Sequence, residues 1–145
     1  MQSAFSKAVD LLSRAEQSAL DIRLKLKKKG YDEEEIKAAI DKLYDLHYLS
    51  DRRYAESYIR RYSGSKSRSL ITRELYMKDI HIDGLDLIFD EVYEYENLNE
   101  EKIIRSLLEH NFKNADFTDE KVKKRAISFL IRHGFNYSSA TLYLT

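Results

Sequence analysis

The chain has 145 residues, with 25 Lys and Arg against 25 Asp and Glu, and 43% of them are hydrophobic. This length suits one domain or a row of small helical units with a packed core. The absence of Cys excludes disulfides, thiolate zinc sites and thiol catalysis. The absence of Pro and the presence of only four Gly argue against a β-sandwich, a dinucleotide-binding fold or a loop-rich enzyme.

Neither a membrane span nor a signal peptide stands out in the sequence. No apolar run approaches the roughly 20 residues that a transmembrane helix needs. The first 19 residues mix acids with bases and lack the apolar core of a signal peptide. We therefore expect a cytoplasmic protein with no membrane partner.

Apolar residues recur with helical spacing along the chain. Phe5 and Val9 are four residues apart near its start, and Tyr54, Tyr58 and Tyr62 repeat this spacing near its middle. Side chains at such spacing share one face of an α-helix. The pattern predicts an all-α protein with helices over residues 3–16, 18–29, 32–47, 51–62, 68–78, 83–96, 98–112, 118–133 and 136–143.

Three segments align without gaps, and they begin at Leu26, Leu75 and Leu130. Four residues after each leucine stands a residue that can end a helix in the left-handed conformation, although Asp does so at some steric cost (Gly30, Asp79, Gly134). A bulky apolar residue comes next in every copy: Tyr31, Ile80 and Phe135. The alternative to a repeat is three coincidental helical hairpins. The recurrence favours three tandem three-helix repeats, over residues 1–50, 51–97 and 98–145, that form an elongated, curved molecule.

The residues after these helix ends also mark where the next helix begins. Asp32 with Glu35 has the spacing of a capping box, and Asn136 can cap the helix of the third copy. His81 is a poor cap, so we expect the middle helix to begin at Asp83 instead.

Charge is strongly partitioned, although the formal net charge is zero. Residues 51–78 carry a net charge of +5, residues 79–101 carry −9, and residues 102–145 carry +4. Such blocks are often solvated helix faces, but they also create local fields that attract partners of opposite charge. The protein could contact a polyanion with one face and a basic protein surface with another.

The basic stretch 52–73 is the first candidate binding surface, because its cations alternate with tyrosines. Arg and Lys contact phosphates, and Tyr can stack on bases. Tyr54 and Tyr58 are nevertheless expected in the core. The acidic helix 83–96 could neutralise part of the basic charge internally, which is the rival explanation. We expect one continuous basic face made of Arg52, Arg53, Arg60, Arg61, Lys66, Arg68 and Arg73.

Two further basic clusters are secondary candidates. Lys25, Lys27 and Lys28 lie near the end of a predicted helix, where they can instead compensate the helix dipole. The other cluster occupies the polar side of helix 118–133, whose apolar side includes Phe129 and Leu130. Its members are Lys121, Lys123, Lys124, Arg125 and Arg132.

Nothing in the sequence supports catalysis, a metal or a cofactor. There is no phosphate-binding Gly loop and no Gly-x-Ser-x-Gly turn. The four histidines, at 47, 81, 110 and 133, form no His-x-x-x-His pair. We expect a protein that is not an enzyme and has no catalytic residue.

The ordered set of motifs resembles the RecX family, bacterial regulators of the RecA recombinase. It comprises Leu24-x-Leu26-x-x-x-Gly30-Tyr31, Arg53-Tyr54-Ala55, Ile71-x-x-Glu74-Leu75 and Phe129-Leu130-x-Arg132-x-Gly134-Phe135. The resemblance implies three tandem three-helix repeats that bind the RecA–single-stranded-DNA filament. It also implies negative regulation of RecA recombinase and ATPase activity, of recombinational DNA repair and of the SOS response. We expect a monomer.

The alternative is a stand-alone helical DNA-binding protein of the helix-turn-helix type. The helix pairs around Gly30 and Gly134 resemble that motif. The helix after Gly30, however, begins with the acidic run Asp32 to Glu35, where it would meet phosphates. Binding to bare DNA and to RecA-coated DNA at one salt concentration would separate the two interpretations.

Overall fold

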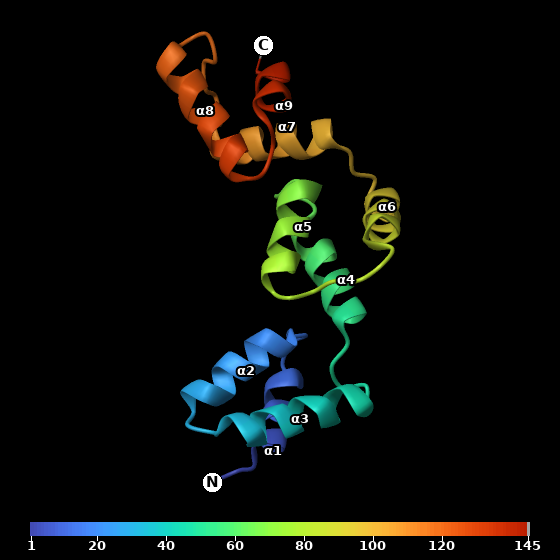
Figure 1. Cartoon of the computed structure of the whole chain (residues 1–145). Coiled ribbons are helices and arrows are strands. Elements are labelled where there is room, and N and C mark those ends of the chain that lie inside the picture. The colour runs from blue at the N-terminus through green and yellow to red at the C-terminus, as the bar shows by residue number, and fades with distance from the viewer. Residues whose placement is uncertain (145) are drawn as a thin grey trace. The chain divides into compact units, whose positions relative to one another are not determined.

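In the computed structural model, the described residues 1–144 form nine α-helices and no β-strand (Figure 1). This confirms the predicted all-α fold. The helices are α1 (Ala4–Leu12), α2 (Ala19–Lys28), α3 (Glu33–Asp45), α4 (Asp51–Tyr62), α5 (Arg68–Met77), α6 (Leu85–Tyr95), α7 (Glu100–Asn111), α8 (Glu120–Arg132) and α9 (Tyr137–Leu142).

The largest boundary difference is in α1, which was predicted to reach residue 16 and ends at Leu12. The Ser13 hydroxyl donates to the Asp10 carbonyl, and the Gln17 amide donates to the Leu11 carbonyl at 2.8 Å. These side chains satisfy carbonyls that a continuing helix would have used, so they end it early.

Helices α2, α5 and α8 end in the same turn, as predicted from the aligned segments. Gly30, Asp79 and Gly134 have φ angles of 97°, 60° and 96°. One residue later, an amide donates back to the carbonyl of Leu26, Leu75 or Leu130, at 3.0 to 3.2 Å. This 6→1 bond defines a Schellman motif. The three leucines are fully buried.

A second pair of equivalent helix ends was not predicted. His47 and Asn97, 50 residues apart, end α3 and α6 with positive φ angles of 61° and 53°. The next amides donate back to Leu43 and Tyr93, each at 2.8 Å. The repeat therefore extends to the last helix of the first two copies, where Asn and His replace the more recognisable Gly.

The predicted helix starts are met in part. Asp32 accepts from the Glu35 amide, but the Glu35 carboxylate accepts from the Ala4 amide at 2.8 Å instead of completing a capping box. Asn136 caps α9 as expected. Helix α6 begins after Gly84, at φ 77° and without a side-chain cap, rather than at Asp83.

The chain divides into two compact units. The first comprises Met1–Ser57 and Leu75–Asp83, and the second comprises Tyr58–Glu74 and Gly84–Thr145. Residues 51–97, the predicted middle repeat, contribute to both units. The three-repeat boundaries remain a prediction about internal similarity in the sequence.

In the first unit, α1, α2 and α3 contact one another around a core that includes Ile22, Leu26, Ile36 and Leu43. The ammonium group of Lys78 pairs with Asp21 near the start of α2. Burial of the Asp21 carboxyl raises its pKa, but hydrogen bonds from Lys78 and Ser18 outweigh burial and hold the pKa below 3.8. This pair joins segment 75–83 to the three-helix core.

In the second unit, α7, α8 and α9 surround a core that includes Ile103, Ile104 and Leu130. The start of α5 joins this core at the end of α8. The Ser67 amide donates to the His133 carbonyl at 2.9 Å, and its hydroxyl donates to the Gly134 carbonyl at 2.8 Å. The three equivalent turns are therefore used differently, because within residues 1–144 the turn at Gly134 alone receives this contact from Ser67.

Candidate nucleic-acid interface

The basic side chains of the first candidate surface, residues 52–73, differ in whether they have an internal partner and in which partner it is. At the start of α4, the Arg53 guanidinium pairs with Glu16 at 3.2 Å and donates to the carbonyls of His47 and Tyr48. Arg52 donates to the Asp83 carbonyl at 3.2 Å. Both arginines are exposed, yet each holds α4 to a loop of the first unit.

Lys66 in the second unit is also engaged. Its ammonium group lies 2.9 Å from the Glu74 carboxylate and 4.2 Å from the centroid of the Tyr62 ring. The Tyr58 hydroxyl donates to the same carboxylate at 2.8 Å. Lys66 therefore joins α5 to the end of α4.

Arg68 meets the acidic helix, as the rival explanation predicted. Its guanidinium lies 3.0 Å from Asp90 and 3.5 Å from Asp86, both on α6. It also lies over the rings of Phe89 and Tyr93, at 4.8 and 5.4 Å from their centroids. Part of the basic charge is thus neutralised inside the second unit.

Three members of the first candidate surface keep their charge available. Arg60, Arg61 and Arg73 are exposed, and within residues 1–144 none of them forms an ion pair. Arg61 lies over the Tyr62 ring at 5.3 Å. All three belong to the second unit. They remain predicted contacts for a polyanion.

In the cluster at the end of α2, two of the three lysines have side-chain partners. Lys25 donates to the Gln17 side chain, and Lys27 lies 3.4 Å from Glu33. Lys28 is exposed. All three occupy the last turn of α2, where a cation suits the negative end of the helix dipole. Dipole compensation and local pairing account for most of this cluster.

The cluster on α8 differs, because no ion pair neutralises it within the described part of the chain. We define the α8 basic surface as Lys121, Lys123, Lys124, Arg125 and Arg132. Lys121, Arg125 and Arg132 are four and seven residues apart, so they share one face of the helix. Glu120 is the one acid within α8, and it stands in the first turn.

A pocket of about 470 Å³ opens beside this surface. We call it the Phe112–Phe129 pocket, and its lining is Phe112, Lys124, Arg125, Ser128, Phe129 and Arg132. The rings of Phe112 and Phe129 meet nearly edge to face, with centroids 5.6 Å apart. The sequence had placed Phe129 on the apolar side of α8, but its ring is only half-buried. Three cations, Lys124, Arg125 and Arg132, thus line a pocket together with two aromatic rings.

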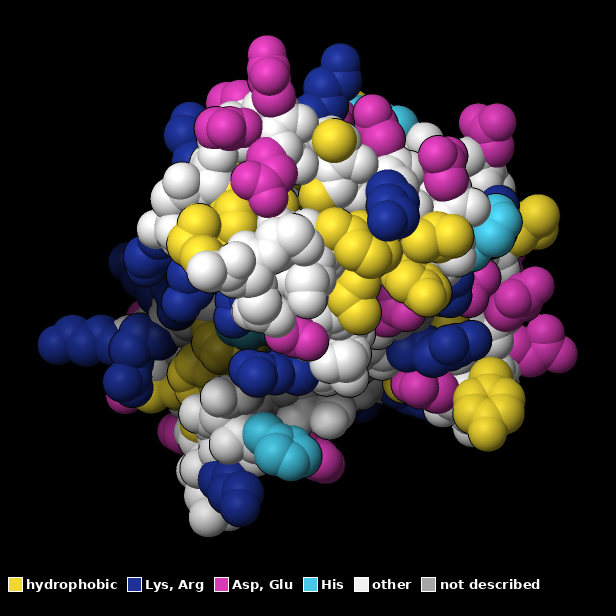
Figure 2. Space-filling model, turned by 90° about the horizontal axis from the view of Figure 1, so that it is seen from below, with side chains coloured by type: hydrophobic (Ala, Val, Ile, Leu, Met, Phe, Trp, Pro, Cys, Tyr) yellow, Lys and Arg dark blue, Asp and Glu magenta, His cyan; other side chains and the backbone are white. Residues whose placement is uncertain are grey.

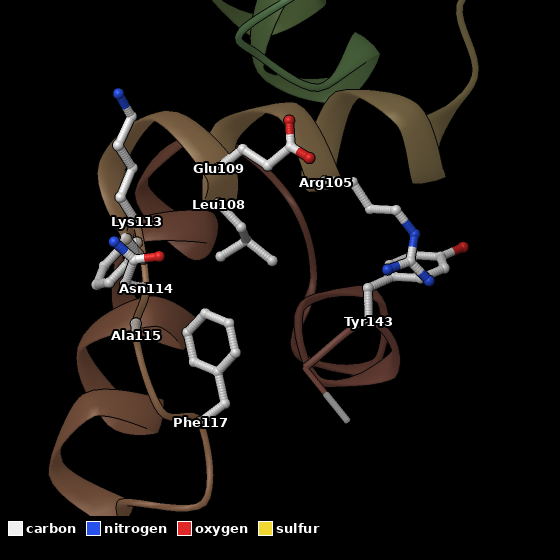
Figure 3. Close-up of a pocket in the computed structure, with 9 residues that line it drawn as sticks. Arg105, Leu108, Glu109, Lys113, Asn114, Ala115, Phe117 and Tyr143 are labelled. Carbon is white, nitrogen blue, oxygen red and sulfur yellow. The ribbon is translucent and has the colours of Figure 1, made fainter.

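A second pocket, of about 490 Å³, also has Phe112 in its lining. Figure 3 shows Phe117 and Leu108 beside this space and the Arg105 guanidinium next to the Tyr143 ring. Arg105 is already paired with Glu101 at 2.9 Å, and Glu109 adds a further acid to the lining. With Lys113, the lining of this pocket holds two cations and one acid, against three cations and no acid in the Phe112–Phe129 pocket.

One face of the molecule mixes charges of both signs. On the face shown in Figure 2, Lys and Arg side chains are interspersed with Asp, Glu and hydrophobic side chains. Among residues 1–144, no three or more His, Asp or Glu side chains are grouped so that they could hold a metal ion. In the same residues, no helix has the length and apolar character needed to cross a membrane.

Comparison with known proteins gives a family for these features. Residues 4–43 match the family model of the RecX first three-helix domain. The chain is 31% identical over 145 aligned residues to the regulatory protein RecX of Vibrio campbellii, covering 99% of this chain and 90% of that protein. The chain belongs to the RecX family. It is also 31% identical over 135 residues to RecX of Haemophilus influenzae strain PittEE, covering 91% and 86% of the two chains.

Solved RecX structures share the fold. A crystal structure of a regulatory protein RecX matches with a TM-score of 0.67 and 22% identity, over 97% of this chain and 69% of that one. RecX from Lactobacillus salivarius matches with a TM-score of 0.60 and 21% identity, over 97% and 92%. The family resemblance and the helical fold are thereby confirmed. The basic residues on α4, α5 and α8 stay predicted contacts of this chain.

Proposed function

We propose that this RecX-family protein is a non-catalytic regulator that binds the RecA–single-stranded-DNA filament and lowers RecA activity. In this role it would restrain RecA ATPase activity, recombinational DNA repair and the SOS response, as a monomer in the cytoplasm. Family membership over nearly the whole chain supports the role. The observation that carries the contact with a polyanionic filament is the unneutralised α8 basic surface.

A regulator without chemistry must act through differential binding. It can shift RecA between two states only by the difference in its binding free energy for them. Arg and Lys side chains supply salt-dependent contacts with phosphates, and the rest of the surface is available for protein contacts. The protein would therefore favour the filament state in which DNA and RecA present both contacts together.

The helix-turn-helix alternative has less support. In that motif the second helix enters the major groove with its N-terminal residues foremost. Here α3 would take that place, and its first turn carries Glu33, Glu34 and Glu35, all exposed. These carboxylates would face phosphates, which opposes groove binding.

The test compares bare and RecA-coated single-stranded DNA at the same stated salt concentration. We expect tighter binding to the coated strand, together with slower RecA-dependent ATP hydrolysis and strand exchange. Equal binding to the two forms of DNA, with RecA activity unchanged at saturating protein, would contradict the proposal.

A further inference from the structure

We infer that the α8 basic surface binds single-stranded DNA directly, with phosphates on its cations and a base in the Phe112–Phe129 pocket. The inference deepens the proposed function, because it assigns this surface to the DNA strand rather than to the RecA protein. It also goes beyond that function, because it requires no RecA for binding.

The first support is the state of the charges. Arg53, Lys66 and Arg68 have carboxylate partners, whereas the α8 basic surface forms no ion pair within residues 1–144. From Lys121 to Arg132 the helix advances by roughly 16 Å, at about 1.5 Å per residue. A row of cations of that length can follow consecutive phosphates of one strand. Each contact releases counterions, so affinity must fall with added salt.

The nearby acids, Asp116, Asp119 and Glu120, stand before α8 or in its first turn, away from its later turns. Asp119 accepts from the Lys121 amide at 2.9 Å as the helix cap. Asp116 accepts from both the amide and the hydroxyl of Thr118. Carboxylates at a helix N-terminus are stabilised by the dipole and the free amides there. The turns from Arg125 to Arg132 contain no acid.

The second support is the pocket among the same cations. Phe112 and Phe129 line the pocket with their rings, Ser128 supplies a hydroxyl, and Lys124, Arg125 and Arg132 complete the lining. The Phe129 ring also lies against the His133 ring, with centroids 4.1 Å apart, so a base would use the rest of the Phe129 surface. Bases stack on aromatic side chains irrespective of sequence, and this is a common mode of single-strand binding. The three groups together fit a nucleotide, which combines a flat ring with a phosphate.

The pocket also distinguishes among polyanions. In duplex DNA the base faces are stacked against one another, so a duplex can use the cations but not the aromatic wall. The acidic side chains of a peptide, Asp and Glu, have no flat ring that would fill the pocket. A single-stranded nucleic acid is the polyanion that uses both features, and the proposed function makes DNA the strand that this protein would meet.

The experiment measures fluorescence anisotropy of a labelled oligothymidine with the full chain, without RecA, over a salt series. The test variant combines Lys124→Gln, Arg125→Gln and Arg132→Gln. The matched control combines Lys25→Gln, Lys27→Gln and Lys28→Gln, which removes the same charge from α2. Circular dichroism melting establishes that both variants are folded.

We expect the α8 variant to bind at least tenfold more weakly and the α2 variant to change by less than twofold. Three lost phosphate contacts should reduce the slope of log K against log salt by about 2, at roughly 0.7 per contact. With the unaltered protein, an abasic oligomer of equal length should bind several-fold more weakly. That comparison tests the pocket without a substitution, and Phe129→Leu should abolish the difference.

Equal losses in the two triple variants would overturn the inference, as would equal binding of the abasic oligomer. Polyglutamate that competes as well as oligothymidine would assign the surface to an acidic protein instead. Filament regulation is measured in parallel on RecA-coated DNA. Intact binding to the bare strand with no effect on RecA would refute the proposed function alone, and the converse would refute this inference alone.

Discussion

Gly30 and Gly134 offer a matched test of how the two helix ends are used. Both occupy the same position of a Schellman turn, with φ angles of 97° and 96°. A Cβ atom at Gly30 would meet no atom within 4 Å. A Cβ atom at Gly134 would lie 2.1 Å from Ser67 Oγ and 2.5 Å from Leu70 Cβ. Substitution by Ala therefore adds the same backbone strain at both sites and a collision at one.

The destabilisation caused by backbone strain can be estimated separately from that caused by the collision. A left-handed Ala costs about 1–2 kcal/mol relative to the right-handed form, and Gly30→Ala should cost this amount alone. At Gly134 the Ser67 hydroxyl cannot turn away freely, because it donates to the Gly134 carbonyl and accepts from the Leu70 amide. Leu70 Cβ can move only with the backbone of α5. Overpacking of this kind adds about 1–3 kcal/mol, so Gly134→Ala should be the worse variant by about 2 kcal/mol.

Urea unfolding and thermal melting, both followed by far-ultraviolet circular dichroism, measure the difference. For a chain of this length, about 2 kcal/mol corresponds to roughly 4–8 °C in melting temperature. Adding Ser67→Ala to Gly134→Ala should recover part of the loss, because it removes the 2.1 Å collision. Equal destabilisation by Gly30→Ala and Gly134→Ala would refute the argument, since backbone strain alone would then suffice.

Substitution can also test the contacts of Arg53 and Asp21 and the exposed charges of Arg60 and Arg61. Arg53→Ala should lower the free energy of unfolding by about 1–2 kcal/mol in urea titrations, since it removes an ion pair and two hydrogen bonds to carbonyls. Arg73 has no ion pair to lose within residues 1–144, so Arg73→Ala should change the free energy of unfolding by less than about 0.5 kcal/mol. The pKa of Asp21 is held below 3.8, so its ionisation stabilises the fold above that pH, and this stability is lost as pH falls through the lower folded value; Asp21→Asn should remove this part of the pH dependence in urea unfolding between pH 2 and 6. Arg60→Glu with Arg61→Glu should weaken binding to RecA-coated DNA tenfold or more, about 1.4 kcal/mol, at an unchanged melting temperature, and a folded double variant that inhibits RecA normally would remove these arginines from the interface.

Helix ends were predictable where the signal is local. A Schellman turn needs a left-handed residue and an apolar residue within six positions, so Gly30 and Gly134 could be found from the sequence. Asp79 was found because its neighbours align with theirs. His47 and Asn97 were missed, since neither residue type marks a helix end strongly by itself. The early end of α1 also escaped prediction, because it depends on the Gln17 side chain reaching back along the chain.

The partners of charged residues were harder to predict than the helices. Spacing shows which side chains share a face of one helix, but it does not show what lies opposite that face. Glu16 is 37 residues from Arg53, and Asp90 is 22 residues from Arg68. Sequence separation therefore hid the contacts that remove four cations from the first candidate surface. The Phe112–Phe129 pocket was missed for the same reason, since its two rings come from either side of a loop.

These contacts indicate what the acidic block of the sequence could do in binding. The acidic residues of α6 pair with Arg68, and Glu91, Glu94 and Glu96 remain exposed nearby in the second unit. Exposed carboxylates repel phosphates over about 8–10 Å at moderate salt. A DNA strand that approaches the second unit should therefore be disfavoured beside α6 and favoured beside α8, whose cations form no ion pair within residues 1–144. The acidic residues of α6 would act in binding by excluding the polyanion from one face. Neutralising two of them, with Glu91→Gln and Glu94→Gln, should therefore strengthen DNA binding although it adds no contact with the DNA.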